Sequence, residues 1–479
     1  MAPNNDQIPT AQQMEEGISS SASQSTPPSN RKRIILILGA SLAVVASVAI
    51  ASYGNIPEEE EANTDHVRQL NVLDRDSFED TSEPDIEPID LPDIDAPAPP
   101  DVNLIAMQFS PDEFEGADKV DLVMQGKLHA VSLRYTKNSF SYAYHDRYDG
   151  VEVEFCKLDY DLHKVDPSAA PTLGHLYDLS SHCVDHSYKF DLADLVAAAQ
   201  DYDNQNDSLT HSMKPRGFIF GEGRSGATVI SNALGVAHPE STRVVAENPV
   251  VSYVLNACND LKIKHAITDC NPLAQKQAFR DVTYLIGRTN NSRETDLYIK
   301  VSPEDSEYMA LALDEFPDAK WAFTYRDPNV VLSKNLQKYR NAICRKAKGA
   351  PSDAAREHAS KMGEDNFANL SIEEACSAHM AAVRNMAISE SNSRGTGRLV
   401  DYDTEIKTGS AIVDDILPNV FGIDMTDAST GTRVSEQIAK KTGRGGGSGK
   451  WTGVDPDEDL SNIPSAITNA NIKFFGAEN

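Results

Sequence analysis

The chain has 479 residues, of which 40% are hydrophobic, so it is long enough for two or three domains with a substantial core. Its formal net charge is −29 at pH 7. Nucleic acid is bound by basic surfaces, because its phosphates are negatively charged. This composition therefore argues against a nucleic-acid partner.

A run of nineteen uncharged residues, IILILGASLAVVASVAIAS, occupies positions 34–52. At 1.5 Å per residue, a helix of this length just crosses a hydrocarbon layer of about 30 Å. Basic residues precede the run and NIPEEEE follows it, so the positive-inside bias leaves the N-terminus in the cytosol. We predict a cytosolic tail at 1–33 and a transmembrane signal-anchor at 34–53. A cleaved signal peptide is the competing interpretation.

Residues 54–118 are predicted to form an acidic, proline-rich stem. Between Gly54 and Asp101 there are sixteen Asp or Glu against two Arg, and prolines recur throughout EPDIEPIDLPDIDAPAPPD. This is the composition of an extended, self-repelling linker. The stem would hold the rest of the chain away from the membrane, on its luminal or extracellular side.

All six cysteines lie beyond the predicted span, where the compartment would be oxidising. We therefore expect disulfides, and the sequence leaves their pairing open, with Cys156 and Cys183 as one candidate pair. Three Asn-x-Ser triplets on the same side predict a glycoprotein: Asn206, Asn290 and Asn369.

Residues 119–200 contain short β-prone runs, LHAVSLRYT, SFSYAYHDRYDG and VEVEFCKLDYDL, followed by a helical DLADLVAAAQ. They predict a small β-rich accessory region. No CxxC accompanies its histidines, and no HxxxH stands on a clear helix, so ordinary surface and core roles are favoured over a metal site. The histidines are His145, His163, His175, His182 and His186.

From residue 214 onward, short apolar runs alternate with helical segments. The runs are bounded by Gly, Pro or charged residues, as buried parallel strands are, and they lie at 217–221, 297–301, 321–325 and 398–402. This alternation predicts an α/β fold over residues 214–479, a P-loop-like three-layer architecture with a central parallel sheet. Ligands of such sheets bind at the carboxyl ends of the strands.

The first apolar run leads into GEGRSGAT at 221–228, which has the spacing of a phosphate-binding loop. Unpaired N–H groups and the dipole at the start of the next helix attract anions, and Thr228 adds a hydroxyl donor. An ATP-binding loop carries lysine where Ala227 stands. The available cation is Arg224, whose bidentate fork suits a phosphate or phosphosulfate. A simple turn at a strand end is the alternative.

A second element, WAFTYRDPNVVLSK, places Arg326 at a strand end. Ser333 follows on the next helix, about two turns along it. Both side chains are suited to bind a further phosphate group, and a salt-bridged strand end is the alternative.

Together these elements resemble the sulfotransferases that use 3′-phosphoadenosine 5′-phosphosulfate (PAPS), in particular the membrane-anchored Golgi enzymes that act on carbohydrates or on protein tyrosine. Those families pair an RSGTT or RSGSS loop with an RDPxxxxxS element, and this chain has RSGAT and RDPNVVLS. NALGVAHPESTRVVAENP supplies Glu247 at a family position, and the segment before FPDAK supplies Lys300. The resemblance covers residues 217–336.

The resemblance implies transfer of a sulfuryl group from PAPS to a hydroxyl acceptor in the Golgi lumen, without a metal. Glu247 would be the general base, while Arg224 and Lys300 would neutralise charge on the leaving phosphate. Arg326 and Ser333 would bind the 3′-phosphate. The loop residues implied to bind PAPS are Gly223, Arg224, Ser225, Gly226, Ala227 and Thr228.

The segment KKTGRGGGSGKW, at 440–451, has the ingredients of the glycine-rich basic loop that often wraps the 3′-phosphate in these enzymes. The resemblance implies that Arg444, Gly445 and Lys450 contact PAPS. A flexible Gly/Ser linker is the alternative.

Two other functions stay open at this stage. A catalytically inactive, membrane-anchored binding protein is favoured by Ala227, which removes a hydroxyl from the loop. An ATP- or GTP-dependent phosphotransferase is disfavoured by the missing loop lysine.

For Glu247, a structural role at a helix start is the alternative to the role of general base. The acceptor is open between sugars, tyrosine and small alcohols. The acidic chain favours a neutral or lightly charged glycan, and the sequence does not indicate the oligomeric state.

Overall fold

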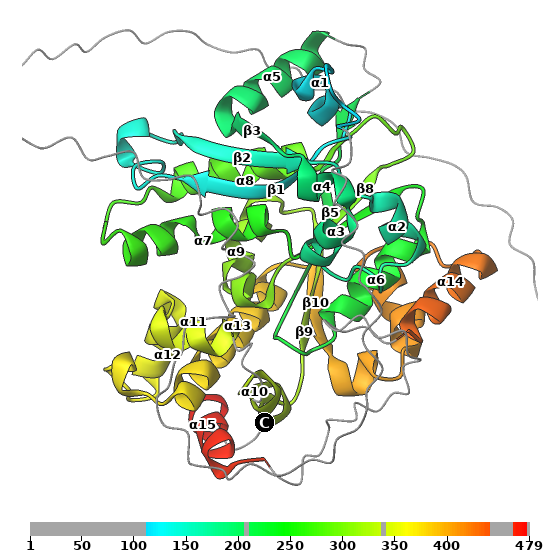
Figure 1. The fold of residues 1–479 in the computed structure, drawn as a ribbon. Helices are drawn as coiled ribbons and strands as arrows, with labels where there is room; N and C mark the ends of the chain where they lie inside the picture. The colour runs from blue at the N-terminus through cyan, green and yellow to red at the C-terminus, as the bar shows by residue number, and fades with distance from the viewer. Residues whose placement is uncertain (1–111, 206–209, 337–341, 441–462, 477–479) are drawn as a thin grey trace, which may run out of the picture. The chain divides into compact units, whose positions relative to one another are not determined.

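The computed structural model describes residues 112–205, 210–336, 342–440 and 463–476 (Figure 1). The predicted tail, signal-anchor and nearly all of the stem lie outside these residues. None of the helices within the described ranges combines the length and the apolar character that a membrane span requires.

A five-stranded, all-parallel sheet forms the centre of the structure, with the strand order β10-β9-β5-β8-β6. The predicted α/β fold with a central parallel sheet is confirmed, and so are the four predicted strands. The fifth strand, TRVVA, was not predicted. The strands are β5 (Pro215–Gly221), β6 (Thr242–Ala246), β8 (Asp296–Lys300), β9 (Lys320–Tyr325) and β10 (Gly397–Asp401).

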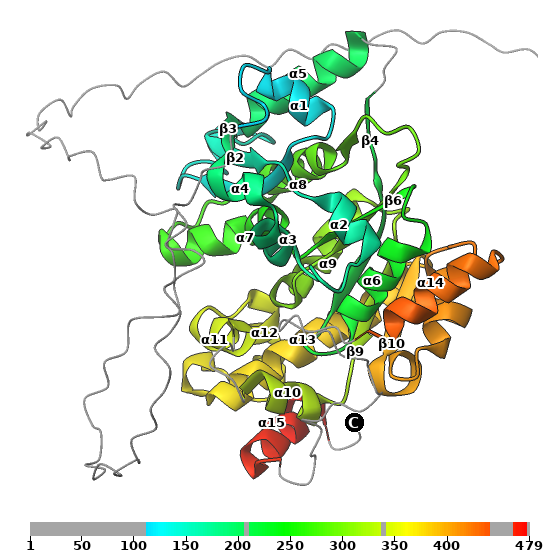
Figure 2. The same cartoon turned by 45° about the vertical axis from the view of Figure 1, so that its right-hand side comes forward.

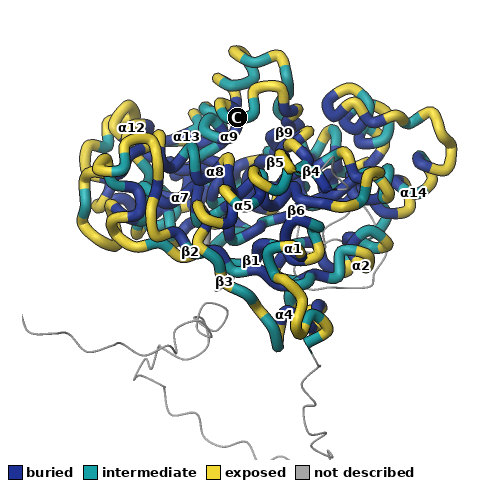
Figure 3. Tube along the Cα trace, turned by 90° about the horizontal axis from the view of Figure 1, so that it is seen from above, coloured by how far each residue is buried: buried dark blue, intermediate teal, exposed yellow. Residues whose placement is uncertain are grey.

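Helices cover both faces of this sheet, because alternate strand residues point to opposite sides. In β5, Ile219 packs into one core with Leu234 of α6 and Ile416 of η6. Its neighbours Phe218 and Phe220 pack into the other core. The strands at the centre are buried in Figure 3. The first core includes α6 (Ala227–Ala237), η6 (Ile412–Val420) and α14 (Ala428–Ile438), and the second includes α7 (Pro249–Lys264), α8 (Pro272–Ile286) and α9 (Met309–Glu315).

The predicted accessory region, 119–200, contains a three-stranded antiparallel sheet and several helices within the compact unit Pro99–Asn479. The sheet consists of β1 (His129–Tyr135), β2 (Val151–Cys156) and β3 (Tyr188–Asp191). The run 139–150, which we had read as β-prone, holds the short helix η2 (Tyr142–Tyr144) instead. Hydrogen bonds from Thr136 N to Ser139 Oγ, and from Ser139 Oγ to Gly150 O, close a local turn there. The helices are α1 (Lys119–Met124), α2 (Tyr160–Val165), α3 (Leu173–Leu179), α4 (Ser181–Asp185) and α5 (Leu192–Gln205).

A further group of helices follows β9 and gathers around α13 (Ile372–Ser393), as both ribbon views show (Figures 1 and 2). Its members are α10 (Pro328–Leu336), α11 (Ala342–Gly349), α12 (Asp353–Lys361) and α15 (Ser465–Phe475). The remaining elements are the short strands β4 (His211–Ser212) and β7 (Arg288–Thr289), and the helical turns η3 (Pro303–Tyr308), η4 (Phe367–Asn369) and η5 (Tyr402–Ile406).

All six cysteines are paired, as an oxidising compartment would allow. Cys156 bonds to Cys183, which confirms the pair suggested by the sequence. The other disulfides join Cys258 to Cys270 and Cys344 to Cys376. The last of these fastens α11 to α13.

We predict that the Cys344–Cys376 disulfide stabilises the fold more than the Cys258–Cys270 disulfide. Their sequence separations are 32 and 12 residues, and a longer closed loop removes more entropy from the unfolded chain. Alanine at both positions should cost about 3–4 kcal/mol for the longer loop and about 1 kcal/mol less for the shorter one. Urea unfolding of the two double variants under non-reducing conditions measures both losses. Equal losses would contradict the loop-length account.

Candidate functional site

The strand order sets the place where a ligand is expected to bind. From β5 the chain crosses to β6 at the edge of the sheet, returns to β8 beside β5, and then crosses to β9 on the other side of β5. The order therefore reverses at β5, and ligands of open parallel sheets bind in the crevice outside such a switch point. The loop GEGRSGAT begins at this carboxyl end.

Two residues of the loop have left-handed backbones, Arg224 with φ 70° and Gly226 with φ 92°. A Cβ atom on Gly226 would lie 2.7 Å from the ring of Tyr402. One on Gly221 would lie 2.1 Å from Thr324 Oγ1. These glycines are therefore needed for the tight passage from β5 into α6.

The loop presents a row of backbone N–H groups. Within the described ranges, no atom accepts a hydrogen bond from the N–H groups of Gly223, Arg224, Gly226, Ala227 or Thr228. Gly223 and Ala227 are buried. Successive unpaired N–H groups at the start of an 11-residue helix form a concave site that favours an anion. We call these five groups the N–H cradle.

The side chains of the loop differ in their burial and in their contacts. Ser225 is buried, and its Oγ lies 2.7 Å from Thr324 Oγ1 and donates to the Glu222 carbonyl oxygen, so its hydroxyl braces the loop. Thr228 is half-buried in the first turn of α6. Arg224 is exposed and makes no hydrogen bond or ion pair with any residue that the structure describes.

Sequence reasoning missed a largely buried ion pair beneath the loop, between Glu222 and Arg384. Arg384 of α13 donates from Nε and Nη2 to the carboxylate of Glu222, at 2.7 and 2.9 Å. Its Nη2 also donates to the carbonyl oxygen of Arg326 at 2.6 Å. Burial raises the pKa of Glu222, and Arg384 opposes this shift. Arg384 thus joins the loop to the end of β9. Glu222 is an acidic residue in a loop that is expected to bind an anion. This was the sequence signal that could have indicated a basic partner.

The structure brings together two predicted catalytic residues, Lys300 and Glu247. Lys300 ends β8 and is buried, and its Nζ donates to Glu247 Oε1. Glu247 follows β6 directly, and its backbone N donates to the Lys300 carbonyl oxygen at 2.8 Å. The cap of α7 is Asn248, whose Oδ1 accepts from Val250 N at 2.8 Å. Glu247 therefore does not serve as the N-cap of that helix.

Arg326 is buried at the end of β9, as predicted, and has an acidic partner. Its Nε lies 3.2 Å from Asp403 Oδ1, and its guanidinium stacks 4.4 Å from the ring centre of Tyr402. Asp327 instead caps α10 by accepting from Asn329 N at 2.7 Å. Ser333 is buried on α10. The predicted contacts Arg444, Gly445 and Lys450 lie outside the described residues.

A buried polar cluster supports the loop from below. Ser306 Oγ of η3 accepts from Gly221 N and donates to Gly221 O, each at 3.1 Å. On either side of it, Asp305 and Glu307 are buried, and Lys346 Nζ of α11 lies 3.4 and 3.5 Å from their carboxylates. Burial raises the pKa of Asp305 to about 6, against the opposing charge of Lys346. The cluster fastens η3, and through it the loop, to α11.

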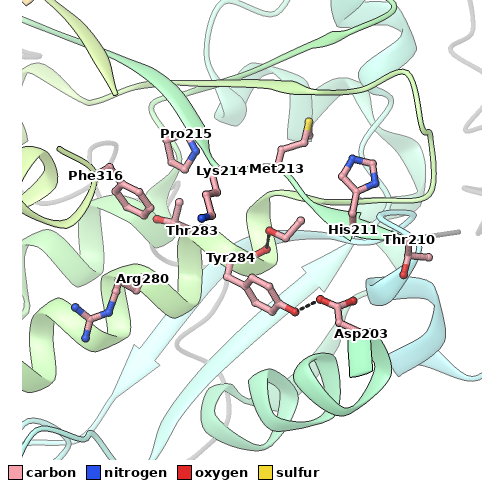
Figure 4. Close-up of a pocket in the computed structure, with 11 residues that line it drawn as sticks. Asp203, Thr210, His211, Met213, Lys214, Pro215, Arg280, Thr283, Tyr284 and Phe316 are labelled. Carbon is pink, nitrogen blue, oxygen red and sulfur yellow. Dashed lines mark hydrogen bonds between the residues drawn. The ribbon is translucent and has the colours of Figure 1, made fainter. Parts of the chain in front are cut away.

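A cavity of about 410 Å³ lies elsewhere in the molecule. Pro215, the first residue of β5, lines it (Figure 4). The cavity therefore sits near the amino end of β5, opposite the N–H cradle.

In the part of the chain that the structure describes, no three His, Cys, Asp or Glu side chains are grouped so that they could hold a metal ion.

No protein-family model and no curated protein matches this sequence. Among solved structures, sulfotransferase STF9 from Mycobacterium avium is 12% identical, with a TM-score of 0.29 over 51% of this chain and 71% of that one. Sulfotransferase STF1 from Mycobacterium tuberculosis is 15% identical, with a TM-score of 0.29 over 51% of this chain and 75% of that one. A TM-score this low does not establish a shared fold.

We predict that Arg384→Met destabilises the protein by about 3–5 kcal/mol, because it leaves the Glu222 carboxylate buried without its partner. Glu222→Gln in the same chain should recover part of the loss, since the unpaired charge is then gone. A double-mutant cycle from urea unfolding of the two single variants and the double variant measures the coupling. Additive losses would show that the two side chains do not depend on each other.

We also predict a pH dependence from Asp305, whose folded-state pKa of about 6 exceeds the usual 3.8. The folded protein then binds this proton more tightly than the unfolded chain, so the contribution of Asp305 to stability falls as the pH rises from about 4 to 6. Over this pH range, the contribution of Asp305 to the free energy of unfolding falls by about 3 kcal/mol. Urea unfolding at several pH values should show a flatter profile for Asp305→Asn than for wild type. Asp353→Asn, at an exposed position, is the control, and an unchanged profile in Asp305→Asn would contradict the assignment.

Proposed function

We propose that the chain is a sulfotransferase that moves the sulfuryl group of PAPS to a hydroxyl acceptor. The observation that carries this proposal is the N–H cradle at the switch point of the sheet. The buried Lys300 and the half-buried Glu247 form a pair at the ends of the neighbouring strands β8 and β6, on the same edge. An anion site beside a lysine and a carboxylate has the groups that transfer to a hydroxyl requires.

The donor groups fit the phosphosulfate of PAPS better than the phosphates of ATP. The N–H cradle and the exposed Arg224 offer hydrogen bonds and positive charge to an anion. Ala227 occupies the position at which an ATP-binding loop has the lysine that reaches the β- and γ-phosphates. Arg326 is suited to the 3′-phosphate, which would take the place of Asp403 as its partner. Ser333, which is buried on the following helix, is the second residue assigned to this phosphate.

Each residue then has a physical role. PAPS supplies the sulfuryl group when it is bound. Glu247 accepts the proton of the acceptor hydroxyl as the hydroxyl oxygen bonds to sulfur. The bond between sulfur and the 5′-phosphate oxygen breaks, and adenosine 3′,5′-bisphosphate is the leaving group. Lys300 holds the Glu247 carboxylate in place and, with Arg224, offsets negative charge that builds up on the phosphate side. The N–H cradle fixes the 5′-phosphate.

A second candidate is a catalytically inactive binding protein of the same architecture. It is favoured by carboxylates that already contact two of the predicted cations, Glu247 on Lys300 and Asp403 on Arg326. Such pairs would persist in a protein that binds a ligand without turning it over. Turnover of PAPS separates the two candidates.

We extend the proposal to the Golgi lumen, with a type II signal-anchor at 34–53 and a neutral or lightly charged glycan as the acceptor. Complete pairing of the cysteines supports an oxidising compartment. Asn290 and Asn369, in two of the three glycosylation triplets, are exposed, as acceptors must be. The anchor itself lies outside the described residues.

Adenosine 3′,5′-bisphosphate, at a hundred times its dissociation constant, should stabilise the full chain by about 2.7 kcal/mol and raise its melting temperature. We predict that Arg326→Ala removes most of this shift. The matched control is Arg216→Ala at the other end of the sheet, where Arg216 also has a carboxylate partner, Asp296 at 2.6 Å. Equal losses in the two variants, or a larger shift with ATP, would count against the PAPS site.

We further predict that Glu247→Gln lowers kcat by a factor of about 10² to 10⁴, as loss of a general base does, while the thermal shift with the bisphosphate persists. The measurement is transfer of radiolabelled sulfate from PAPS to a panel of neutral glycans. Bisphosphate binding by wild type without turnover on any acceptor would favour the inactive binding protein. Full activity in Glu247→Gln would reject the assigned base.

A further inference from the structure

The cavity near the amino end of β5 is separate from the proposed reaction site. β5 has seven residues and spans roughly 20 Å, which is the distance between the cavity and the N–H cradle along the strand. The cavity volume of about 410 Å³ falls within the range of small-molecule sites. Its apolar wall is formed by Met213, Pro215, the ring of Tyr284 and Phe316.

Most polar groups that line this cavity already have partners. Asp203 accepts two hydrogen bonds from the buried Arg288, each at 2.7 Å, and a third from Tyr284. Thr210 Oγ1 accepts from Arg288 at 3.0 Å. Ser212 Oγ donates to the Tyr284 carbonyl oxygen at 2.6 Å. These groups need nothing from a ligand.

The charges at the cavity are also balanced, with one exception. Arg280 forms an ion pair with Glu315. Asp203 is neutralised by Arg288. Lys214 forms no hydrogen bond or ion pair with the residues that the structure describes, and Figure 4 shows its side chain extending toward Thr283. The cavity therefore carries an uncompensated positive charge at one side.

Thr283 provides a second, independent observation. Its side chain is 1% exposed and lines the cavity, and its Oγ1 has no hydrogen-bond partner among the described residues. A buried hydroxyl without a partner costs about 1–3 kcal/mol, so a group that satisfies it is favoured there. Lys214 is an exposed residue whose ammonium has no partner among the described residues, and Thr283 is buried. Both groups can donate a hydrogen bond to the same ligand.

We propose that this cavity binds a small organic anion with an apolar body, of the class of an aryl- or alkyl-carboxylate. The apolar wall takes the body of the ligand, and the carboxylate accepts hydrogen bonds from Lys214 and Thr283. Because the cavity lies at the opposite end of β5, its ligand does not contact the proposed reaction centre. The proposal does not depend on sulfotransferase activity.

Isothermal titration of the full chain with 4-phenylbutyrate tests the charge requirement. The neutral 4-phenylbutan-1-ol and the cationic 4-phenylbutylamine have the same apolar body. We expect the carboxylate to bind at least about tenfold more tightly than either, since only it complements Lys214. Absence of carboxylate binding, or equal binding of the alcohol, overturns the proposal.

Two variants test the assigned groups. Lys214→Met should weaken carboxylate binding by about tenfold, and Thr283→Val, which has nearly the same shape, by a few-fold. Lys137→Met, at another exposed lysine, is the control and should leave binding unchanged. Unchanged affinity in Lys214→Met overturns the proposal even if Thr283→Val fails to fold. The thermal shift with adenosine 3′,5′-bisphosphate should persist in Lys214→Met, which separates this cavity from the site at the carboxyl edge.

Discussion

The parallel direction of all five central strands is the constraint on which the candidate site depends. Each strand ends at the same edge, so residues far apart in the sequence become neighbours there. Lys300 and Glu247 contact each other because β8 and β6 are adjacent and in register, with Lys300 opposite Ala246. The loop after β5 lies between the ends of β8 and β9, where the strand order reverses and a crevice for a ligand is expected.

Side chains of α13 and η3 hold the loop in its shape. Arg384 binds Glu222 beneath the loop and the Arg326 carbonyl oxygen at the end of β9, so one guanidinium fixes two predicted phosphate-binding segments. Ser306 fixes Gly221 from the other side. A buried pair of this kind gives little net stability, but removal of one member is costly. Because Arg384 binds both segments at once, we infer that it specifies their relative arrangement.

The sequence predicted the elements that have a clear local signal. Four strands and the loop were found because apolar runs bounded by Gly or Pro, and glycines at fixed spacing, are local patterns. The strand TRVVA was missed because it begins with a threonine and an arginine and so has only three apolar residues, although Arg243 is buried against Glu294. Arg384 could not be predicted, since it is 162 residues from Glu222 and only the fold brings them together. The same holds for Asp403, which is 77 residues from Arg326.

Under the proposed function, the pairing of Arg326 with Asp403 would affect which nucleotides the site accepts. A buried guanidinium without an anion is unfavourable, so Asp403 stabilises the arginine before a ligand arrives. A ligand group that replaces the Asp403 carboxylate must compensate for the lost ion pair. A phosphate with two negative charges and three free oxygens would do so better than a neutral hydroxyl. A nucleoside with a free 3′-hydroxyl would leave the Arg326–Asp403 pair intact and gain nothing from it. Under the proposed function, the Asp403 carboxylate would therefore set a threshold that favours a 3′-phosphorylated nucleotide, with Asp403 acting through Arg326.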